Sequence, residues 1–184
     1  MSKLIVARDL LESALTGMEF AAYLSADDLG TVYREQVVLT DMTIYFNMAG
    51  KLPNQKQRSD LNAAMSKLIE EGHLTAEVIG RGIYLIDCQK SFRCDLICGT
   101  AVVMFESVRK IVASGQSWQG MLRYYLIIAS HQRNNKACTY SRKYFADKIN
   151  IGEITLSKYN TALTKLGVLK ISRRKNSTST YLTI

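Results

Sequence analysis

Proline and long apolar runs are nearly absent from this chain of 184 residues. A single proline, Pro53, and 11 glycines exclude a collagen-like repeat and argue against long flexible linkers. No apolar run approaches the ~20 residues that a membrane-spanning helix needs, so we expect no membrane partner. The first residues lack the charged and apolar regions of a secretory signal, which favours a cytoplasmic protein.

The side chains that most enzymes use for catalysis are scarce as well. The two histidines, His73 and His131, lie at positions typical of loops or strand starts, where surface roles are commoner than catalysis. No glycine-rich phosphate-binding loop is present, and the four acidic residues after residue 90 are too few for a two-metal nuclease site. We therefore expect no enzymatic activity, no catalytic residues and no cofactor.

The four cysteines, Cys88, Cys94, Cys98 and Cys138, match no standard zinc-binding spacing. Neither histidine lies at a ligand spacing from them, and disulfides between them would not persist in a reducing compartment. The sequence thus predicts buried or half-buried thiols and no metal site.

Positive charge is concentrated in the second half of the chain. Residues 1–90 contain 9 Lys or Arg and 12 Asp or Glu, whereas residues 91–184 contain 15 and 4. The net charge of +8 therefore comes from the C-terminal half. A basic region attracts polyanions, of which nucleic acid is the commonest, although a solvated basic face can also serve solubility alone.

Apolar spacing after Ser117 predicts three helices and a hairpin. With Ser117 as N-cap, the first helix buries one stripe from Trp118 to Ala129. A tight turn at 150–152 separates a second helix, capped by Ser141, from a third that ends at Gly167. The expected inward positions are Phe145, Ala146, Ile149, Leu156, Tyr159, Leu163 and Leu166. Two strands around a basic turn then complete a helix-turn-helix with a hairpin.

This region resembles bacterial winged-helix proteins. The residues that carry the resemblance are Ser141, Phe145, Ala146, Lys148, Ile149, Ile151, Thr155, Leu156, Ser157, Lys158, Leu163, Leu166 and Gly167. It is most similar to the winged-helix modules of plasmid and phage replication initiators and to the helix-turn-helix part of DnaD-like proteins. Asn160 departs from the pattern, which more often has an apolar residue at that position.

The resemblance implies a DNA interface centred on the last of the three helices, because an α-helix fits the major groove. The outward side of that helix carries Thr155, Ser157, Lys158, Thr161 and Lys165. The preceding helix offers Arg142, Lys143 and Lys148 to backbone phosphates. The hairpin tip offers Arg173, Arg174 and Lys175 to phosphates or to an adjacent minor groove.

The first 90 residues predict a second unit of the same kind. The expected elements are a helix within residues 4–24, a strand over 36–40, a helix capped by Asp41, a helix capped by Ser59 or Asp60 and ending at Gly72, and a hairpin over 73–87. We expect an N-terminal winged-helix-like domain (1–90), a connecting strand and helix (91–116) and a basic C-terminal winged-helix domain (117–184).

The acidic N-terminal half has two possible roles, DNA binding and protein binding. Its DNA-facing candidates are Lys56, Arg58, Lys67 and Arg81. The alternative is a dimerisation or partner-binding domain on the same scaffold, so a homodimer stays an open expectation.

The predicted fold class is mainly α with small β-hairpins (α+β), arranged as tandem winged helix-turn-helix units. The predicted function is sequence-specific binding of double-stranded DNA, as a nucleoid-associated transcriptional regulator of a plasmid, phage or other mobile element. The alternatives are a replication initiator or primosome-type DNA-binding protein, and a non-enzymatic protein–protein adaptor built on winged helices.

Overall fold

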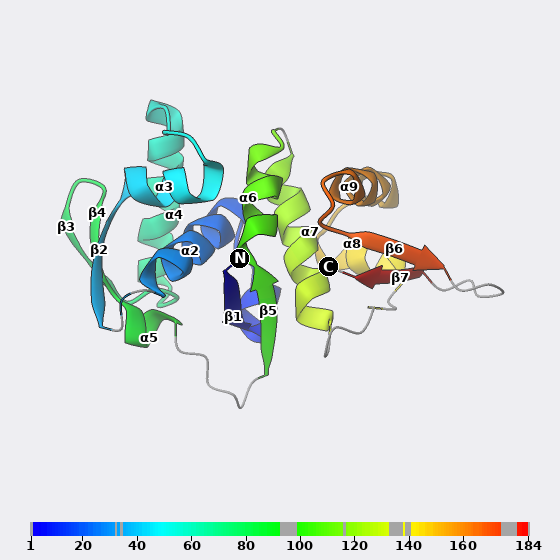
Figure 1. Ribbon diagram of the computed structural model, residues 1–184, viewed down its shortest axis with the longest axis horizontal. Helices are drawn as coiled ribbons and strands as arrows, with labels where there is room; N and C mark the ends of the chain where they lie inside the picture. Colours follow the sequence, from blue (N-terminus) through cyan, green and yellow to red (C-terminus); the bar gives the residue numbers. More distant parts are fainter. Residues whose placement is uncertain are drawn as a thin grey trace.

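The computed structural model describes residues 2–31, 33, 35–92, 99–115, 117–132, 138, 141–173 and 180–183. The protein has an α+β fold in which the helices lie mostly between small antiparallel sheets (Figure 1). In chain order the elements are β1 (Lys3–Ala7), α1 (Arg8–Glu12), α2 (Gly17–Gly30), β2 (Gln36–Thr40), α3 (Asp41–Ala49), α4 (Gln55–Glu70), β3 (Ala76–Gly80), β4 (Ile83–Asp87), α5 (Cys88–Phe92), β5 (Thr100–Met104), α6 (Phe105–Ala113), α7 (Trp118–His131), α8 (Arg142–Lys148), α9 (Glu153–Lys165), β6 (Lys170–Arg173) and β7 (Thr180–Thr183).

The sheets connect segments that are near and far in sequence. A three-stranded sheet has the order β2-β4-β3, and β6 pairs with β7 at the other end of the molecule. Between them, β1 pairs antiparallel with β5, so that Lys3 lies opposite Met104. Strand β1 therefore pairs with β5, which comes after the whole N-terminal half in the sequence.

Helices α2 and α7 form the centre of a core that is continuous through both halves of the chain. Helix α2 packs against α3, α4, α6 and α7, and all of its residues from Gly17 to Asp27 are buried. Helix α7 packs against α1, α2, α6 and β5 on one side and against α9 on the other (Figure 1). The two halves therefore share one apolar interior.

The helix expected within residues 4–24 is wrong, because this segment contains β1, α1 and the start of α2. Leu4 and Val6 are buried while Lys3 and Ile5 are exposed, which is the alternation of a half-buried strand. Helix α2 begins after Thr16, whose hydroxyl accepts a hydrogen bond from the Glu19 amide in a reciprocal capping box.

Two expected helix caps are also wrong. Helix α3 is capped by Thr40 rather than Asp41, and α4 begins after Asn54 rather than at Ser59 or Asp60. Ser117 occupies the N-cap position of α7 as expected, but it has φ +70° and its side chain makes no capping hydrogen bond. The Ser141 cap of α8 and the hairpin of β3 and β4 are confirmed. Cys88 and Cys138 are buried thiols, whereas Cys94 and Cys98 lie outside the described residues.

The first turn of α2 approaches the backbone of α7 very closely. A Cβ atom built on Gly17 would lie 2.5 Å from both the Cα and the carbonyl oxygen of Gln119. Real Cβ atoms do not approach backbone this closely, so the two helices could keep their spacing only with glycine at this position.

Replacing Gly17 with alanine should lower the free energy of unfolding by about 1–3 kcal/mol, the range for overpacking a well-packed site. Urea unfolding followed by circular dichroism measures the loss. Gly152→Ala is the control, because open space surrounds Gly152 and its φ is −72°. Its cost should stay below about 1 kcal/mol. Equal losses in the two variants would contradict the close-packing argument.

The carboxyl group of Asp27 is buried in α2. Burial, with a smaller contribution from the negative charge of Asp28, raises the pKa of Asp27 from 3.8 to about 7. The folded state therefore holds this proton more tightly than the unfolded chain, and the stability due to this group is lost as pH rises from about 4 to 7.

Asp27→Asn should thus stabilise the protein at pH 8 and have little effect at pH 4. A shift of three pKa units corresponds to up to about 4 kcal/mol at the higher pH. Urea unfolding of both proteins at the two pH values measures the difference. If the variant is no more stable than the native protein at pH 8, ionisation of Asp27 does not lower the free energy of unfolding and the argument is contradicted.

Candidate nucleic-acid interface

Helix α9 is held to the protein by one face only. Leu156 and Leu163 are fully buried, and Ile151 packs against the core in the turn that precedes the helix. That turn contains Asn150 at φ +54°, and the Ile151 amide donates to the Ala146 carbonyl at 3.0 Å. The opposite face of α9 is exposed, with Lys158, Thr161 and Lys165 on it.

An open hollow of about 670 Å³ runs along α9. It is lined by Arg142 at the start of α8, by Ser157, Asn160, Thr161, Thr164 and Lys165 of α9, and by Ile171 of β6. Among the described residues, the lining contains two cations and several hydroxyl groups but no acidic side chain. Such a surface can donate hydrogen bonds to an anion from α8 and from α9.

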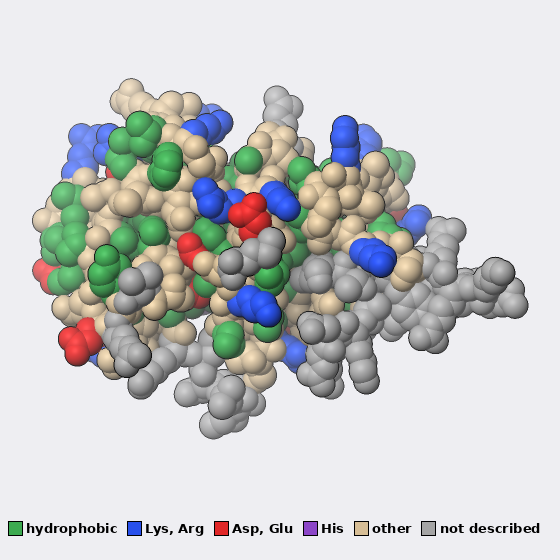
Figure 2. Space-filling view, viewed as in Figure 1, with side chains coloured by type: hydrophobic (Ala, Val, Ile, Leu, Met, Phe, Trp, Pro, Cys, Tyr) green, Lys and Arg blue, Asp and Glu red, His purple; other side chains and the backbone are tan. Residues whose placement is uncertain are grey.

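The structure brings together four of the residues expected at a DNA interface: Arg142, Ser157, Thr161 and Lys165. Lys158 and Lys143 are exposed on α9 and α8 outside the hollow, and Thr155 is half-buried. Within the described residues, none of the cations Arg142, Lys143, Lys158 and Lys165 forms an ion pair. Basic side chains project above the region of α9 in Figure 2.

Lys148 is placed differently from the other expected contacts. Its Nζ lies 3.4 Å from Glu12 Oε2, an ion pair that joins α8 to α1. Arg173 ends β6, but its side chain is not described, and Arg174 and Lys175 of the expected wing tip lie outside the described residues.

Asn160 is a residue of this hollow that the sequence did not assign to the site. It is only 8% exposed and occupies an inward position of α9. Its Oδ1 accepts a hydrogen bond of 2.8 Å from the Tyr124 hydroxyl of α7. Burial raises the pKa of Tyr124, so this hydroxyl remains a protonated donor. The sequence signal that could have assigned Asn160 to the site is the polar side chain at a position where the pattern expects an apolar one.

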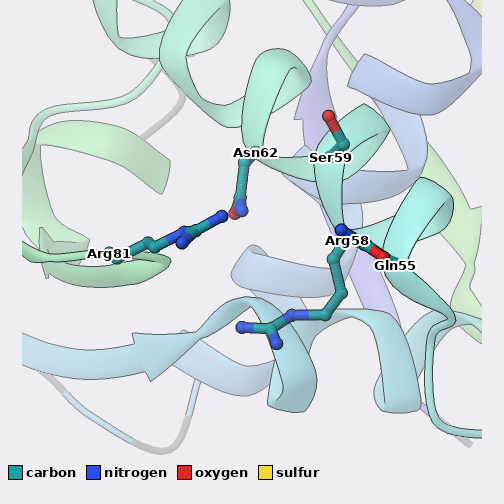
Figure 3. A pocket seen from close by; sticks show the side chains of 5 residues that line it. All are labelled: Gln55, Arg58, Ser59, Asn62 and Arg81. Carbon is teal, nitrogen blue, oxygen red and sulfur yellow. The ribbon is translucent and has the colours of Figure 1, made fainter.

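A second, smaller hollow of about 450 Å³ lies in the N-terminal half (Figure 3). It is lined by Gln55, Arg58, Ser59 and Asn62 of α4 and by Arg81 of the turn between β3 and β4. Figure 3 shows the Arg81 side chain reaching from that turn toward Asn62. Two of the expected DNA contacts, Arg58 and Arg81, therefore line the same hollow, while Lys56 is exposed outside it.

Arg58 is engaged by a buried acid. Its Nη2 lies 2.9 Å from Asp41 Oδ2, and the Asp41 side chain is only 2% exposed. Asn62 also donates to Asp41 at 3.3 Å and accepts a hydrogen bond from Tyr84 at 2.8 Å. The Asp41 amide donates to the Gly82 carbonyl, so Asp41 ties α3 to α4 through its carboxylate and to the hairpin turn through its backbone.

Lys67 has a comparable structural partner. Its Nζ lies 3.1 Å from both carboxylate oxygens of Glu19, whose side chain is 8% exposed. Glu19 in turn accepts a hydrogen bond from the Thr16 amide at the start of α2. The positive charges of Arg58 and Lys67 are therefore largely neutralised within the protein.

No protein-family model matches the chain, and no curated protein matches it in sequence. None of the helices in the described part of the chain has both the length and the apolar character that crossing a membrane requires.

The two arginines of the smaller hollow should respond differently to substitution. Arg58→Met should lower the free energy of unfolding by about 1–3 kcal/mol, because it removes the charged donors from a buried carboxylate. Arg81→Met, on the exposed side of the same hollow, should change stability by less than about 0.5 kcal/mol. Urea unfolding at neutral pH measures both, and equal effects would contradict a structural role for Arg58.

Proposed function

We propose that the protein binds double-stranded DNA through α9 and the hollow beside it. The observation that carries the proposal is that Arg142, Lys143, Lys158 and Lys165, on α8 and α9, form no ion pair with any described residue. Two of the contacts expected in the N-terminal half, Arg58 and Lys67, are instead held by buried acids. Unpaired cations on an exposed helix attract the phosphates of a duplex and release the counterions bound there.

The order of elements supports winged-helix units. In the C-terminal half, α7, α8 and α9 precede the hairpin of β6 and β7; in the N-terminal half, α2, β2, α3 and α4 precede the hairpin of β3 and β4. Both orders are those of a helix-turn-helix followed by a wing. The second helix of such a motif enters the major groove, which here assigns α9 to that role.

The exposed side of α9 suits this task chemically. Lys158 and Lys165 can contact phosphates, while Ser157 and Thr161 can bond phosphates or base edges. Arg142 lies across the hollow, where it can contact the same strand. We propose a sequence-specific reader that acts as a transcriptional regulator of a mobile element, with replication initiation as the alternative role.

A partner-binding role for the N-terminal half is the second candidate. Its described surface exposes large apolar side chains, among them Val38, Phe46, Leu52 and Val78, while two of its expected DNA contacts are paired with acids. These features favour contact with a protein over contact with phosphates.

Removing the two lysines of α9 should weaken DNA binding and reduce its dependence on salt. For Lys158→Gln with Lys165→Gln, the slope of log affinity against log salt should become shallower by about 2. Fluorescence anisotropy with a labelled duplex of random sequence measures affinity and slope. Selection from random duplexes then tests whether the protein reads a sequence.

The matched control removes two exposed lysines elsewhere, Lys90→Gln with Lys110→Gln, and makes the same change in net charge. Its affinity and salt slope should stay close to those of the native protein. If both double variants lose affinity equally, binding depends on net charge and α9 is not the interface. If neither binds less tightly than the native protein, the proposed interface is wrong.

A further inference from the structure

Asn160 is a polar residue fixed in place at the floor of the hollow beside α9. It is 92% buried, and its Oδ1 is held at 2.8 Å by the hydroxyl of Tyr124, which is itself fully buried. The carboxamide is planar, with an acceptor oxygen at one end and a donor nitrogen at the other. Since Oδ1 faces α7, the orientation of the donor end is fixed by the same bond.

The donor end of Asn160 has no partner within the described part of the protein. Asn160 lines the hollow, and its Nδ2 makes no hydrogen bond to any described residue. Asn160 Nδ2 is not among the fully buried atoms that lack a partner, so the donor is accessible from the hollow. An acceptor that enters the hollow can therefore reach a donor that the rest of the side chain holds in place.

The remaining lining specifies what kind of acceptor fits. Arg142 and Lys165 contribute two positive charges, and Ser157 and Thr164 contribute hydroxyl groups, while no carboxylate of a described residue lines the hollow. Asp147 and Glu153, the described acids of α8 and α9, are exposed and do not line it. A tetrahedral oxyanion accepts hydrogen bonds from several directions at once, which matches a hollow that offers mainly donors.

We propose that this hollow is a phosphate-binding site in which Asn160 Nδ2 donates to a phosphate oxygen and Arg142 and Lys165 balance the charge. The occupant is a backbone phosphate of duplex DNA, and to that extent the inference rests on the proposed function. Tyr124 acts as a positioning residue because it turns the amide donor, rather than the carbonyl, toward the phosphate. The site would anchor α9 on the duplex independently of base sequence.

The test follows the side-chain NH₂ signals of Asn160 by ¹H–¹⁵N NMR of the full chain during titration with inorganic phosphate. Sodium chloride at matched ionic strength corrects for general salt effects. The Asn160 signals should shift to saturation with phosphate and not with chloride. Arg142→Gln should weaken this binding about tenfold, as expected for loss of one charged contact. The control Lys143→Gln, next in sequence but outside the hollow, should bind phosphate like the native protein.

The Asn160→Asp variant removes the amide donor but keeps the size and shape of the side chain. An aspartate oxygen still accepts from Tyr124, but the group that faces the hollow becomes an acceptor, so phosphate binding should be abolished. Because a buried charge can disturb folding, Tyr124→Phe with Asn160→Leu provides a second variant with no unpaired polar group. Circular dichroism checks that it folds, and phosphate affinity, followed by backbone signals around the hollow, should fall at least as much as in Arg142→Gln.

Titration with duplex DNA assigns the source of the phosphate. Shift of the same Asn160 signals by DNA, with displacement of bound inorganic phosphate, supports the backbone assignment. Saturation by phosphate without any response to DNA would keep the hollow as a site for a smaller phosphorylated ligand and overturn the proposed function. An Asn160 response to phosphate no larger than that to chloride would overturn the site itself.

Discussion

The packing of helix α7 on both of its sides is the constraint on which the arrangement of the protein depends. One side of α7 closes the core of the N-terminal half against α2, α6 and β5, and its other side carries α9. Its backbone at Gln119 meets Gly17 so closely that no side chain fits between them. Neither half can change its position without disrupting buried contacts of the other, so the exposed face of α9 has a fixed orientation relative to the N-terminal hairpin.

Elements whose signals lie in neighbouring residues could be predicted from the sequence. The position of α7, the cap of α8 at Ser141 and the glycine-containing hairpin of β3 and β4 are of this kind. The single buried stripe expected for α7 is wrong, because the helix packs on both sides and is buried almost all round from Met121 to Ser130. Strand β1 could not be predicted in this way. Leu4 and Val6, followed by Leu10 and Leu11, suit a helix as well as a strand, and the choice is made by pairing with β5, far along the chain.

The same limit applies to the candidate interface. The excess of basic residues was visible in the composition, but which of them are neutralised depends on tertiary contacts. Arg58 and Lys67 meet their acids only because α3 and α2 pack against α4. In the sequence, Asn160 is a polar residue that interrupts the apolar pattern. Its orientation, however, depends on a hydrogen bond from Tyr124, which lies on another helix. Sequence thus identified the helix and most polar residues beside it, but not the buried amide among them.

The pairing of β1 with β5 also constrains the order in which the chain can fold during synthesis. Lys3 is synthesised well before Met104, its partner in the sheet. Until β5 has emerged, Leu4 and Val6 lack the neighbouring strand beside which they are buried in the finished fold. Contacts between residues so distant in sequence form slowly, because a long loop must close first. Strand β1 is therefore among the last parts of the N-terminal half to become ordered, although it is synthesised before most of them.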